Sequence, residues 1–269
     1  MDPTPFAAET LPIAFRDEHL VVVHKPSGLL VHRTSLDAHE TRFALQLLRR
    51  QLRQRVYPVH RLDKGASGAL LFALRPQIAA TLGESVRQGG LKRSYLAIVR
   101  GHTPEEGAID RPLEQRRDPA EPSGRRDAAA RERDDDEIEP GTRDALTHYR
   151  RLATVELPHR VDRYPTSRYS LLELRPATGR RHQLRRHLSH ASHPILGDST
   201  YGKGRHNRLF TELFDSRRLL LACVELRFEH PVSSRPLTVT TPLAADFAAV
   251  VDRLGWTGDV PGHWLERGR

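Results

Sequence analysis

One carboxylate stands out among the residues of this chain that could do chemistry. The stretch 60–65 reads HRLDKG, so Asp63 lies between basic neighbours, directly before a small-residue turn and an apolar run that begins at Leu70. An acid in this setting is either a structural ion-pair partner or a catalytic carboxylate at the rim of a sheet. Because the chain holds 43 basic and 34 acidic residues, a carboxylate in a positive field is a candidate nucleophile toward a polyanion. Asp63 is therefore the first residue to explain.

Three further segments combine basic, aromatic and turn residues. Lys25 opens the turn KPSG, which a tight connection between two strands would explain by itself. Tyr95 lies two residues beyond a basic pair in KRSYLA, and taken alone it is also typical of a core residue. The stretch 178–187 (TGRRHQLRRH) predicts a helix that opens with cations and free N–H groups, which favours an anion, and HPILGD follows at 193–198.

The overall charge favours a polyanionic partner. The formal net charge is +9 and the isoelectric point is near 10.2. Phosphate contacts supply most of the sequence-independent affinity for nucleic acid, so nucleic acid is the leading candidate. Only four of the 43 basic residues are lysines, and a bias in genome composition is the simplest explanation of the arginine excess.

Cysteine and histidine usage argues against disulfides and metal. Cys223 is the only cysteine, which excludes an intrachain disulfide and a cysteine zinc cage. The histidines between 182 and 193 lie among arginines that would repel a cation, so we expect no metal and no cofactor. The first residues lack a signal-peptide pattern, and no apolar stretch approaches the roughly 18 residues of a membrane helix. We therefore expect a soluble, cytoplasmic protein with no membrane contact.

The apolar periodicity predicts an α+β fold. Period-two and β-branched runs predict strands, and apolar residues three and four apart predict helices. Strands outnumber helices without regular βαβ alternation, which favours a mainly antiparallel mixed sheet with flanking helices in a single domain. The expected strands are 20–24, 93–99, 146–155, 168–175, 219–229 and 236–241, and the expected helices are 41–55, 77–88 and 180–191.

One domain is expected to occupy residues 11–255. Residues 1–10 are rich in Pro and Thr and predict a flexible N-terminus, and residues 256–269 are expected to form a C-terminal tail. Within the domain, residues 114–145 alternate Arg with Asp and Glu and contain almost nothing large and apolar. Such a segment cannot bury enough surface to offset its ordering entropy, so we expect a mobile charged insertion. A solvated loop that faces RNA is the alternative.

Taken together, these segments resemble the RluA-type pseudouridine synthases. The family order is KPSG, HRLD, Ser-Gly, KR-x-Y-x-A, GR-x-HQLR-x-H and HPI-x-GD, and the chain carries it between about residues 13 and 250. The resemblance implies the pseudouridine synthase catalytic fold and isomerisation of uridine in RNA, with no cofactor. The stretches 163–169, 182–188 and 204–210 are most similar to a subgroup that acts on tRNA, which implies uridine 65 as the target.

The resemblance also implies roles for individual residues. Asp63 matches the essential aspartate that triggers cleavage of the N1–C1′ bond, by attack on the ribose, attack on the base or removal of a ribose proton. Tyr95 matches the tyrosine that stacks on the uracil and acts as general base for the C5 proton. Arg185 matches the basic residue that pairs with the aspartate and keeps it ionised. Arg61 matches the arginine that fills the space left by the flipped base. The other residues expected to contact RNA or shape the site are His60, Lys64, Arg180, His182 and the turn 25–28.

The chain departs from the family pattern at two positions. Ala66 stands where the family usually has Thr, and Ala222 stands where it usually has His. Neither departure touches Asp63, Tyr95 or Arg185, so we expect activity to survive.

Three functions remain open from the sequence. The first is a tRNA pseudouridine synthase, the second is a ribosomal RNA pseudouridine synthase, and the third is a catalytically silent RNA-binding protein. An intact acid, tyrosine and arginine count against the third. In each case the expected partner is RNA, and we expect a monomer without an obligate protein partner.

Overall fold

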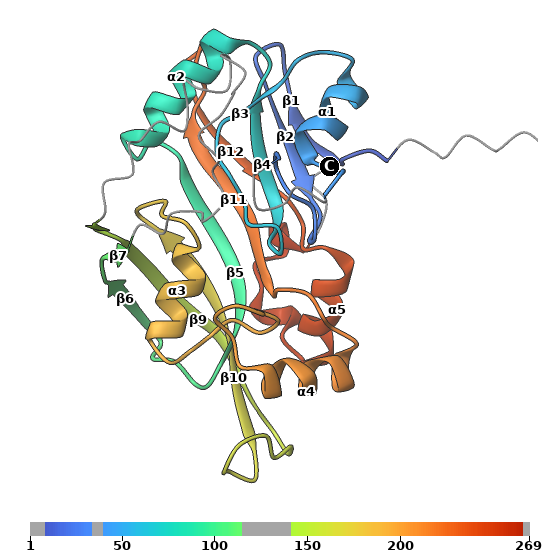
Figure 1. Cartoon of the computed structure of the whole chain (residues 1–269), viewed down its shortest axis with the longest axis vertical. Helices are drawn as coiled ribbons and strands as arrows, with labels where there is room; N and C mark the ends of the chain where they lie inside the picture. The colour runs from blue at the N-terminus through green and yellow to red at the C-terminus, as the bar shows by residue number, and fades with distance from the viewer. Residues whose placement is uncertain (1–8, 34–39, 115–140, 266–269) are drawn as a thin grey trace, which may run out of the picture.

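One mixed sheet of ten strands forms the centre of the molecule (Figure 1). The computed structural model describes residues 9–33, 40–114 and 141–265. The strands of the sheet are β1 (Ile13–Arg16), β2 (Leu20–Lys25), β3 (Tyr57–Pro58), β4 (Ser67–Ala73), β5 (Lys92–Arg100), β6 (Glu106–Asp110), β9 (Leu146–Leu157), β10 (Ser167–Pro176), β11 (Leu221–Glu229) and β12 (Pro236–Thr240). Their order is β1-β2-β4-β11-β5-β10-β9-β6, with β12 paired to β11 and β3 paired to β4.

The pairing of β4 with β11 is what makes the sheet mixed. These two strands run parallel, whereas the other strand pairs in the described ranges are antiparallel. Gly68 in β4 has a φ of +109°, and a Cβ at this position would lie 2.0 Å from the carbonyl oxygen of Cys223. Only glycine allows so close an approach of two backbones. The start of β4 is thereby fixed against β11, and the Asp63 loop lies directly before it.

Helices cover both faces of the sheet. They are α1 (Ala44–Leu52), α2 (Pro76–Arg87), α3 (Gln183–His190), α4 (Gly204–Phe214) and α5 (Ala245–Arg253). Helices α1 to α3 bury apolar residues in the same core as Ala97 and Val99 of β5, while α4 and α5 share a core with Leu96 and Ile98. Because successive residues of a strand point to opposite faces, β5 separates two cores.

The structure confirms the α+β class and the mainly antiparallel mixed sheet. The expected helices appear as α1, α2 and α3, and the expected strands appear as β2, β5, β9, β10, β11 and β12. Helix α3 begins three residues later than expected, because His182 has a φ of +51° and ends the turn that precedes the helix. Helices α4 and α5 were not predicted from the sequence. No helix in residues 9–33, 40–114 or 141–265 is long and apolar enough to span a membrane.

Two boundaries differ from the expectation. The segment expected to be a tail from residue 256 contains two short 3-10 helices, Thr257–Asp259 and Gly262–Trp264, and it buries Trp256, Val260 and Trp264 in the second core. These large apolar side chains explain why the packed chain continues past residue 255. At the expected insertion 114–145, β7 (Leu113–Glu114) pairs with β8 (Thr142–Arg143), so both flanks are structured. The expectations for residues 115–140 and 1–8 lie outside the described ranges.

Candidate active site

The turn 25–28 holds the loop that carries Asp63 through two hydrogen bonds. The Gly28 N–H donates to the Lys64 carbonyl at 2.8 Å, and the Ser27 hydroxyl donates to the Gly65 carbonyl at 2.6 Å. The turn therefore fixes the two peptide groups that follow Asp63. This finding gives the KPSG sequence a role beyond reversing the chain between two strands.

Lys25 ties the same turn to the same loop from inside the protein. Its side chain is fully buried, and its ammonium donates to the carbonyls of Pro26 at 2.9 Å, Leu29 at 2.7 Å and Lys64 at 3.2 Å. Burial lowers the pKa of Lys25 to about 7, although the charge of Asp63 acts in the opposite direction. Charged lysines are seldom buried without a carboxylate partner. Lys25 therefore fixes the backbone carbonyls of the turn and the loop, and the desolvation of its ammonium costs free energy.

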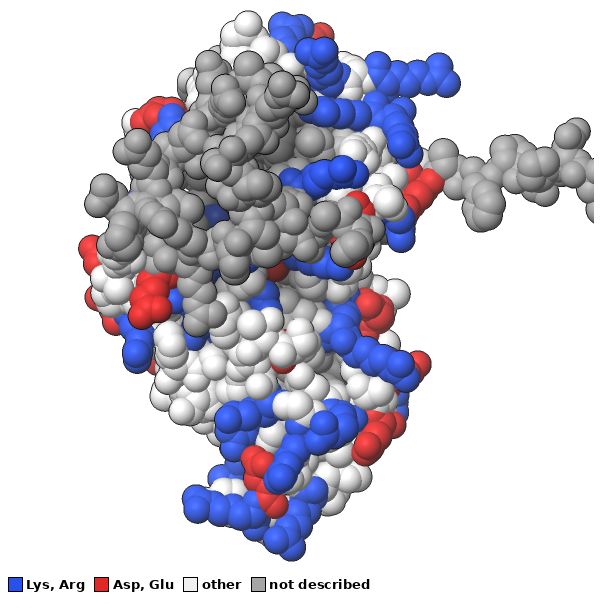
Figure 2. All heavy atoms as spheres, in the orientation of Figure 1, with Lys and Arg blue, Asp and Glu red and all other residues white. Residues whose placement is uncertain are grey.

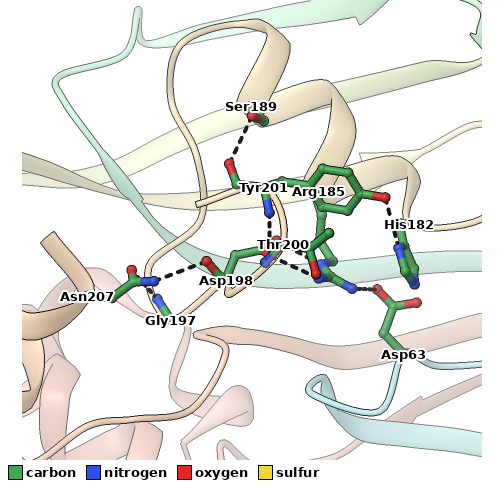
Figure 3. A network of polar contacts seen from close by, with 9 residues as sticks. All are labelled: Asp63, His182, Arg185, Ser189, Gly197, Asp198, Thr200, Tyr201 and Asn207. Atoms are coloured by element: carbon green, nitrogen blue, oxygen red, sulfur yellow. Dashed lines mark hydrogen bonds and ion pairs between the residues drawn. The ribbon is translucent and has the colours of Figure 1, made fainter. Parts of the chain in front are cut away.

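Arg185 links Asp63 to a second carboxylate (Figure 3). One terminal nitrogen of its guanidinium donates to Asp63 Oδ2 at 3.3 Å, while Nε and the other terminal nitrogen donate to the two oxygens of Asp198 at 2.7 and 2.9 Å. The side chains of Asp198, Arg185 and Asp63 are 0%, 10% and 25% exposed, so Asp63 is the member that a substrate can reach. Burial alone would lower the pKa of Arg185, but the hydrogen bonds and charges of the two carboxylates outweigh burial and raise it. Arg185 is therefore a fixed cation beside Asp63.

Backbone hydrogen bonds hold the carboxylate of Asp198 in place. Its Oδ1 accepts the backbone N–H groups of Thr200 and Tyr201, each at 2.9 Å. Burial would raise the pKa of Asp198, but the hydrogen bond from Arg185 and these backbone donors lower it. Gly197 precedes it with a φ of +77°, and a Cβ there would meet the Arg218 carbonyl oxygen at 1.7 Å, so the approach requires glycine. Asp198 is thus ionised and rigid, and it orients Arg185.

His182 and Tyr201 close another side of the site. His182 Nδ1 lies 3.1 Å from the Tyr201 hydroxyl, and the Arg185 guanidinium lies 5.1 Å from the centre of the Tyr201 ring. Burial lowers the pKa of His182, although the charge of Asp63 raises it. The close-up shows both side chains next to the Asp63–Arg185 pair (Figure 3). His182 is therefore a neutral neighbour of Asp63 at neutral pH.

Tyr95 lies in β5 and is only 6% exposed. Burial raises the pKa of its hydroxyl well above the usual range, the neighbouring Cys223 adds to this, and the charge of Asp63 contributes in the same direction. The charge of Asp63 therefore acts on the Tyr95 hydroxyl, and Tyr95 is a neutral phenol in the free protein. Burial opposes ionisation of this hydroxyl in the free protein, and the general-base role that the family resemblance implies stays a prediction.

The residues expected to contact RNA occupy different environments. Arg61 and Lys64 are exposed on the Asp63 loop, and Lys64 pairs with Glu40 at 2.5 Å. Arg180 is half-buried, and its Nε donates to the Asp144 carbonyl at 3.1 Å. These positions leave Arg61 the freest of the three to meet a substrate.

His60 does not lie where RNA could reach it. It is 6% exposed, and its Nε2 accepts the backbone N–H of Leu71 at 3.2 Å. Burial lowers the pKa of His60 to about 3, so the ring is neutral. The expected RNA contact is therefore corrected to a structural role, because the side chain points into the protein and supports β4.

The two departures from the family pattern are both buried. Ala66 and Ala222 are each 1% exposed, in the first and second core respectively. Next to Ala66, the Ser67 hydroxyl accepts a hydrogen bond from Arg218 at 2.6 Å. Both side chains lie beneath the surface, so neither faces a substrate at Asp63.

Histidine-rich α3 has a structural explanation. His187 is fully buried, with Nδ1 3.0 Å from the Thr147 hydroxyl and Nε2 3.0 Å from the Arg111 carbonyl. Within residues 9–33, 40–114 and 141–265, no group of three or more His, Cys, Asp or Glu side chains is arranged to hold a metal ion.

Sequence reasoning missed two contributors to the site. Asp198 was noticed only as the end of HPILGD, although a lone acid in a basic stretch is a signal for a partner of a buried arginine. Tyr201 carried no signal that its spacing could reveal. The fold and the site together define a paired, partly exposed carboxylate beside a buried cation, an arrangement typical of an enzyme active site.

Comparison with known proteins identifies the family. Residues 19–190 match the family described as RNA pseudouridylate synthase. The chain is 44% identical over 247 residues to tRNA pseudouridine synthase C of Vibrio cholerae, covering 91% of this chain and 96% of that protein. The corresponding protein of Vibrio vulnificus is 43% identical over 246 residues, with the same coverage. The solved structure of human RNA Pseudouridylate Synthase Domain Containing 4 superposes with a TM-score of 0.64 at 27% identity, covering 91% and 93% of the two chains. The chain belongs to the RNA pseudouridylate synthase family.

Proposed function

We propose that this chain isomerises uridine to pseudouridine in tRNA, with uridine 65 as the target and Asp63 as the essential carboxylate. The observation that carries the proposal is the asymmetric Asp63–Arg185–Asp198 cluster, which offers one reachable carboxylate beside a fixed cation. The relatives named tRNA pseudouridine synthase C, at 43–44% identity over nearly their whole length, support tRNA as the substrate.

The isomerisation balances without any other reactant. The N1–C1′ bond of the uridine breaks, the uracil turns, a C5–C1′ bond forms, the C5 proton leaves and N1 gains a proton. Neither C1′ nor C5 can be reached inside a stacked helix, so the uridine must flip out at a cost of a few kcal/mol. We propose that Arg61, which is exposed two residues before Asp63, fills the space that the base leaves.

Asp63 starts the reaction by one of three routes. The carboxylate attacks C1′, attacks the base, or removes a ribose proton, and Arg185 holds it in position for each of them. Tyr95 packs against the flipped uracil and limits its orientation while it turns. It also stays the candidate base for the C5 proton.

Ribosomal RNA is the second candidate substrate, because RNA is recognised largely by shape and the same site would serve either RNA. We further propose that the enzyme works in the cytoplasm as a monomer, with no protein partner required. A catalytically silent RNA-binding protein would have no need to hold a buried arginine against a reachable acid.

The test is carbodiimide-coupled primer extension on unmodified tRNA incubated with wild type or Asp63→Ala. We expect a stop that reports position 65 with the wild type alone, while Asp63→Ala binds tRNA within a few-fold of the wild type. Conversion by purified Asp63→Ala would refute the role of the aspartate. Conversion of ribosomal RNA alone would favour the second substrate, and no conversion of either RNA would favour the silent protein.

A further inference from the structure

We infer that the tip of the β9–β10 hairpin and the first turn of α4 form a second RNA-binding surface, which holds the body of the substrate away from the flipped uridine. The inference rests on the proposed function, because it takes the RNA substrate as the partner. No residue of this surface contacts Asp63 or Arg185 directly, so its task is distinct from the chemistry.

The hairpin tip presents an aromatic ring and cations to solvent. Strands β9 and β10 pair up to Leu157 and Ser167, and the hairpin projects from the lower end of the molecule (Figure 1). Tyr164 at the tip is 58% exposed, and the Arg163 guanidinium lies 4.7 Å from the centre of its ring. Arg163 also donates to the Tyr164 hydroxyl at 2.6 Å. A ring that is 58% exposed buries little apolar surface in the hairpin, whereas bases and ribose stack readily on such a platform.

Basic side chains surround this ring. Lys and Arg gather at the same end of the molecule in Figure 2. The exposed basic residues of the hairpin tip (residues 156–168) and of the α4 start are Arg160, Arg163, Arg168, Lys203, Arg205 and Arg208. The acidic residues of this tip are Glu156, which pairs with Arg168 at 2.9 Å, and Asp162. The surface therefore keeps an excess of positive charge, which suits the phosphates of an RNA helix.

Asp162 joins the hairpin to α4. Its carboxylate lies 3.2 Å from Arg100, 3.1 Å from His206 Nε2 and 4.0 Å from Arg205. Its pKa is lowered, first by the hydrogen bond to His206 and then by the neighbouring cations. These contacts offset the negative charge of Asp162. The residue therefore organises the basic surface more than it repels phosphate.

The surface and the catalytic acid share one rigid frame. His206 is buried, and its Nδ1 lies 2.8 Å from the Tyr169 hydroxyl of β10. The next residue, Asn207, accepts the Gly197 N–H at 2.9 Å and donates to the Asp198 carbonyl at 3.0 Å (Figure 3). Asp198 in turn holds Arg185. RNA bound at the hairpin is therefore held at a fixed distance from Asp63, which suits the selection of one uridine within a large folded RNA.

The experiment compares two surface variants with a control on two substrates. Arg160→Gln/Arg163→Gln removes two cations, and Tyr164→Ala removes the ring. The control, Arg50→Gln/Arg87→Gln, removes two exposed cations from α1 and α2 at the other end of the molecule. The substrates are an intact unmodified tRNA and a short stem-loop that carries the target uridine alone.

We expect the KM for intact tRNA to rise at least about tenfold in the Arg160→Gln/Arg163→Gln variant, because it loses two phosphate contacts. The salt dependence of tRNA binding should weaken by a slope of about 2, since each phosphate contact contributes about 0.9. Tyr164→Ala should raise the KM by about fivefold or more through lost stacking. In all three variants kcat should stay within about twofold of the wild type, and conversion of the stem-loop should be unchanged.

An unchanged KM for tRNA in both surface variants would overturn the inference, and so would an equal loss on the stem-loop. A loss of tRNA binding in the control as large as in the surface variants would also overturn it, because the effect would then be one of overall charge. Filter binding of tRNA is measured in parallel. If the wild type converts no uridine, the proposed function fails, while the Kd values still decide whether the hairpin binds RNA.

Discussion

Replacement of Lys25 by Met removes a buried ammonium and leaves a side chain of similar length. In the wild type this ammonium is fully buried, donates to three carbonyls and has a pKa lowered by burial to about 7. Asp63 raises this pKa and Arg218 lowers it, but burial is the largest cause. The structure therefore predicts that Lys25 makes folding stability depend on pH in a range where few other groups titrate.

The sign and the size follow from linkage. The unfolded chain keeps the proton on Lys25 up to its ordinary pKa of 10.5, whereas the folded chain releases it above about 7. Below pH 7 the folded protein bears the full cost of a buried charge, and this cost disappears as the pH rises toward 10.5. One pKa unit is about 1.4 kcal/mol, so the whole window amounts to about 5 kcal/mol, with about 2–3 kcal/mol of it between about pH 6 and about pH 9.

The assay is urea unfolding of wild type, Lys25→Met and Lys92→Met at these two pH values. Lys92 is an exposed lysine, so its variant is the matched control. The free energy of unfolding of the wild type should rise by about 2–3 kcal/mol more than that of Lys25→Met between the two pH values, and Lys92→Met should follow the wild type. Lys25→Met lacks the hydrogen bonds to the three carbonyls at both pH values, so the comparison uses the change in free energy of unfolding between the two pH values and not either value alone. Equal pH dependence of wild type and Lys25→Met would refute the argument that burial desolvates the amine.

Three further predictions concern the site and its surroundings. Arg185→Lys should lower kcat by roughly a hundredfold, because a single ammonium cannot serve Asp63 and Asp198 at once; near-normal single-turnover rates would contradict this. Asp198→Asn should reduce the free energy of unfolding by about 3–5 kcal/mol in urea titrations, since it leaves Arg185 poorly paired in a buried position. Deletion of residues 116–141 behind a short turn should leave the melting temperature nearly unchanged, because β7 and β8 already pair on both sides; a large fall would show that the segment is packed.

The local sequence patterns predicted three of the five helices and half of the strands, namely β2, β5, β9, β10, β11 and β12, within the described residues. Strands such as β5 could be predicted because both of their faces are buried, which gives a continuous apolar run in the sequence. Helices α4 and α5 were not predicted from the sequence. Their apolar residues, such as Phe210 and Phe247, are buried only because they pack against the second face of the sheet. The packed segment after residue 255 was missed for the same reason, since two tryptophans in a polar stretch do not reveal the core that receives them.

The sequence predicted the pairing of Arg185 with Asp63, which the structure contains, but it did not predict how Arg185 is oriented. That information lies in the loop that ends at Asp198, where a glycine, two backbone N–H groups and Asn207 meet. His60 shows the opposite error. The family resemblance implied an RNA contact for His60, yet its side chain faces inward and is 6% exposed, while the next residue, Arg61, is exposed.

Arg185 forms unequal hydrogen bonds with two carboxylates, and this difference gives each acid its own role. Asp198 takes the two shorter hydrogen bonds of the guanidinium, at 2.7 and 2.9 Å, and Asp63 takes the longer one, at 3.3 Å. Asp198 therefore offsets most of the positive charge that burial would otherwise make costly. The longer bond aligns Asp63 while its side chain stays 25% exposed and available to a substrate. Without Asp198 the whole charge of the guanidinium would face Asp63, so the second acid supports the proposed catalytic role of Asp63 by leaving its carboxylate less tightly paired.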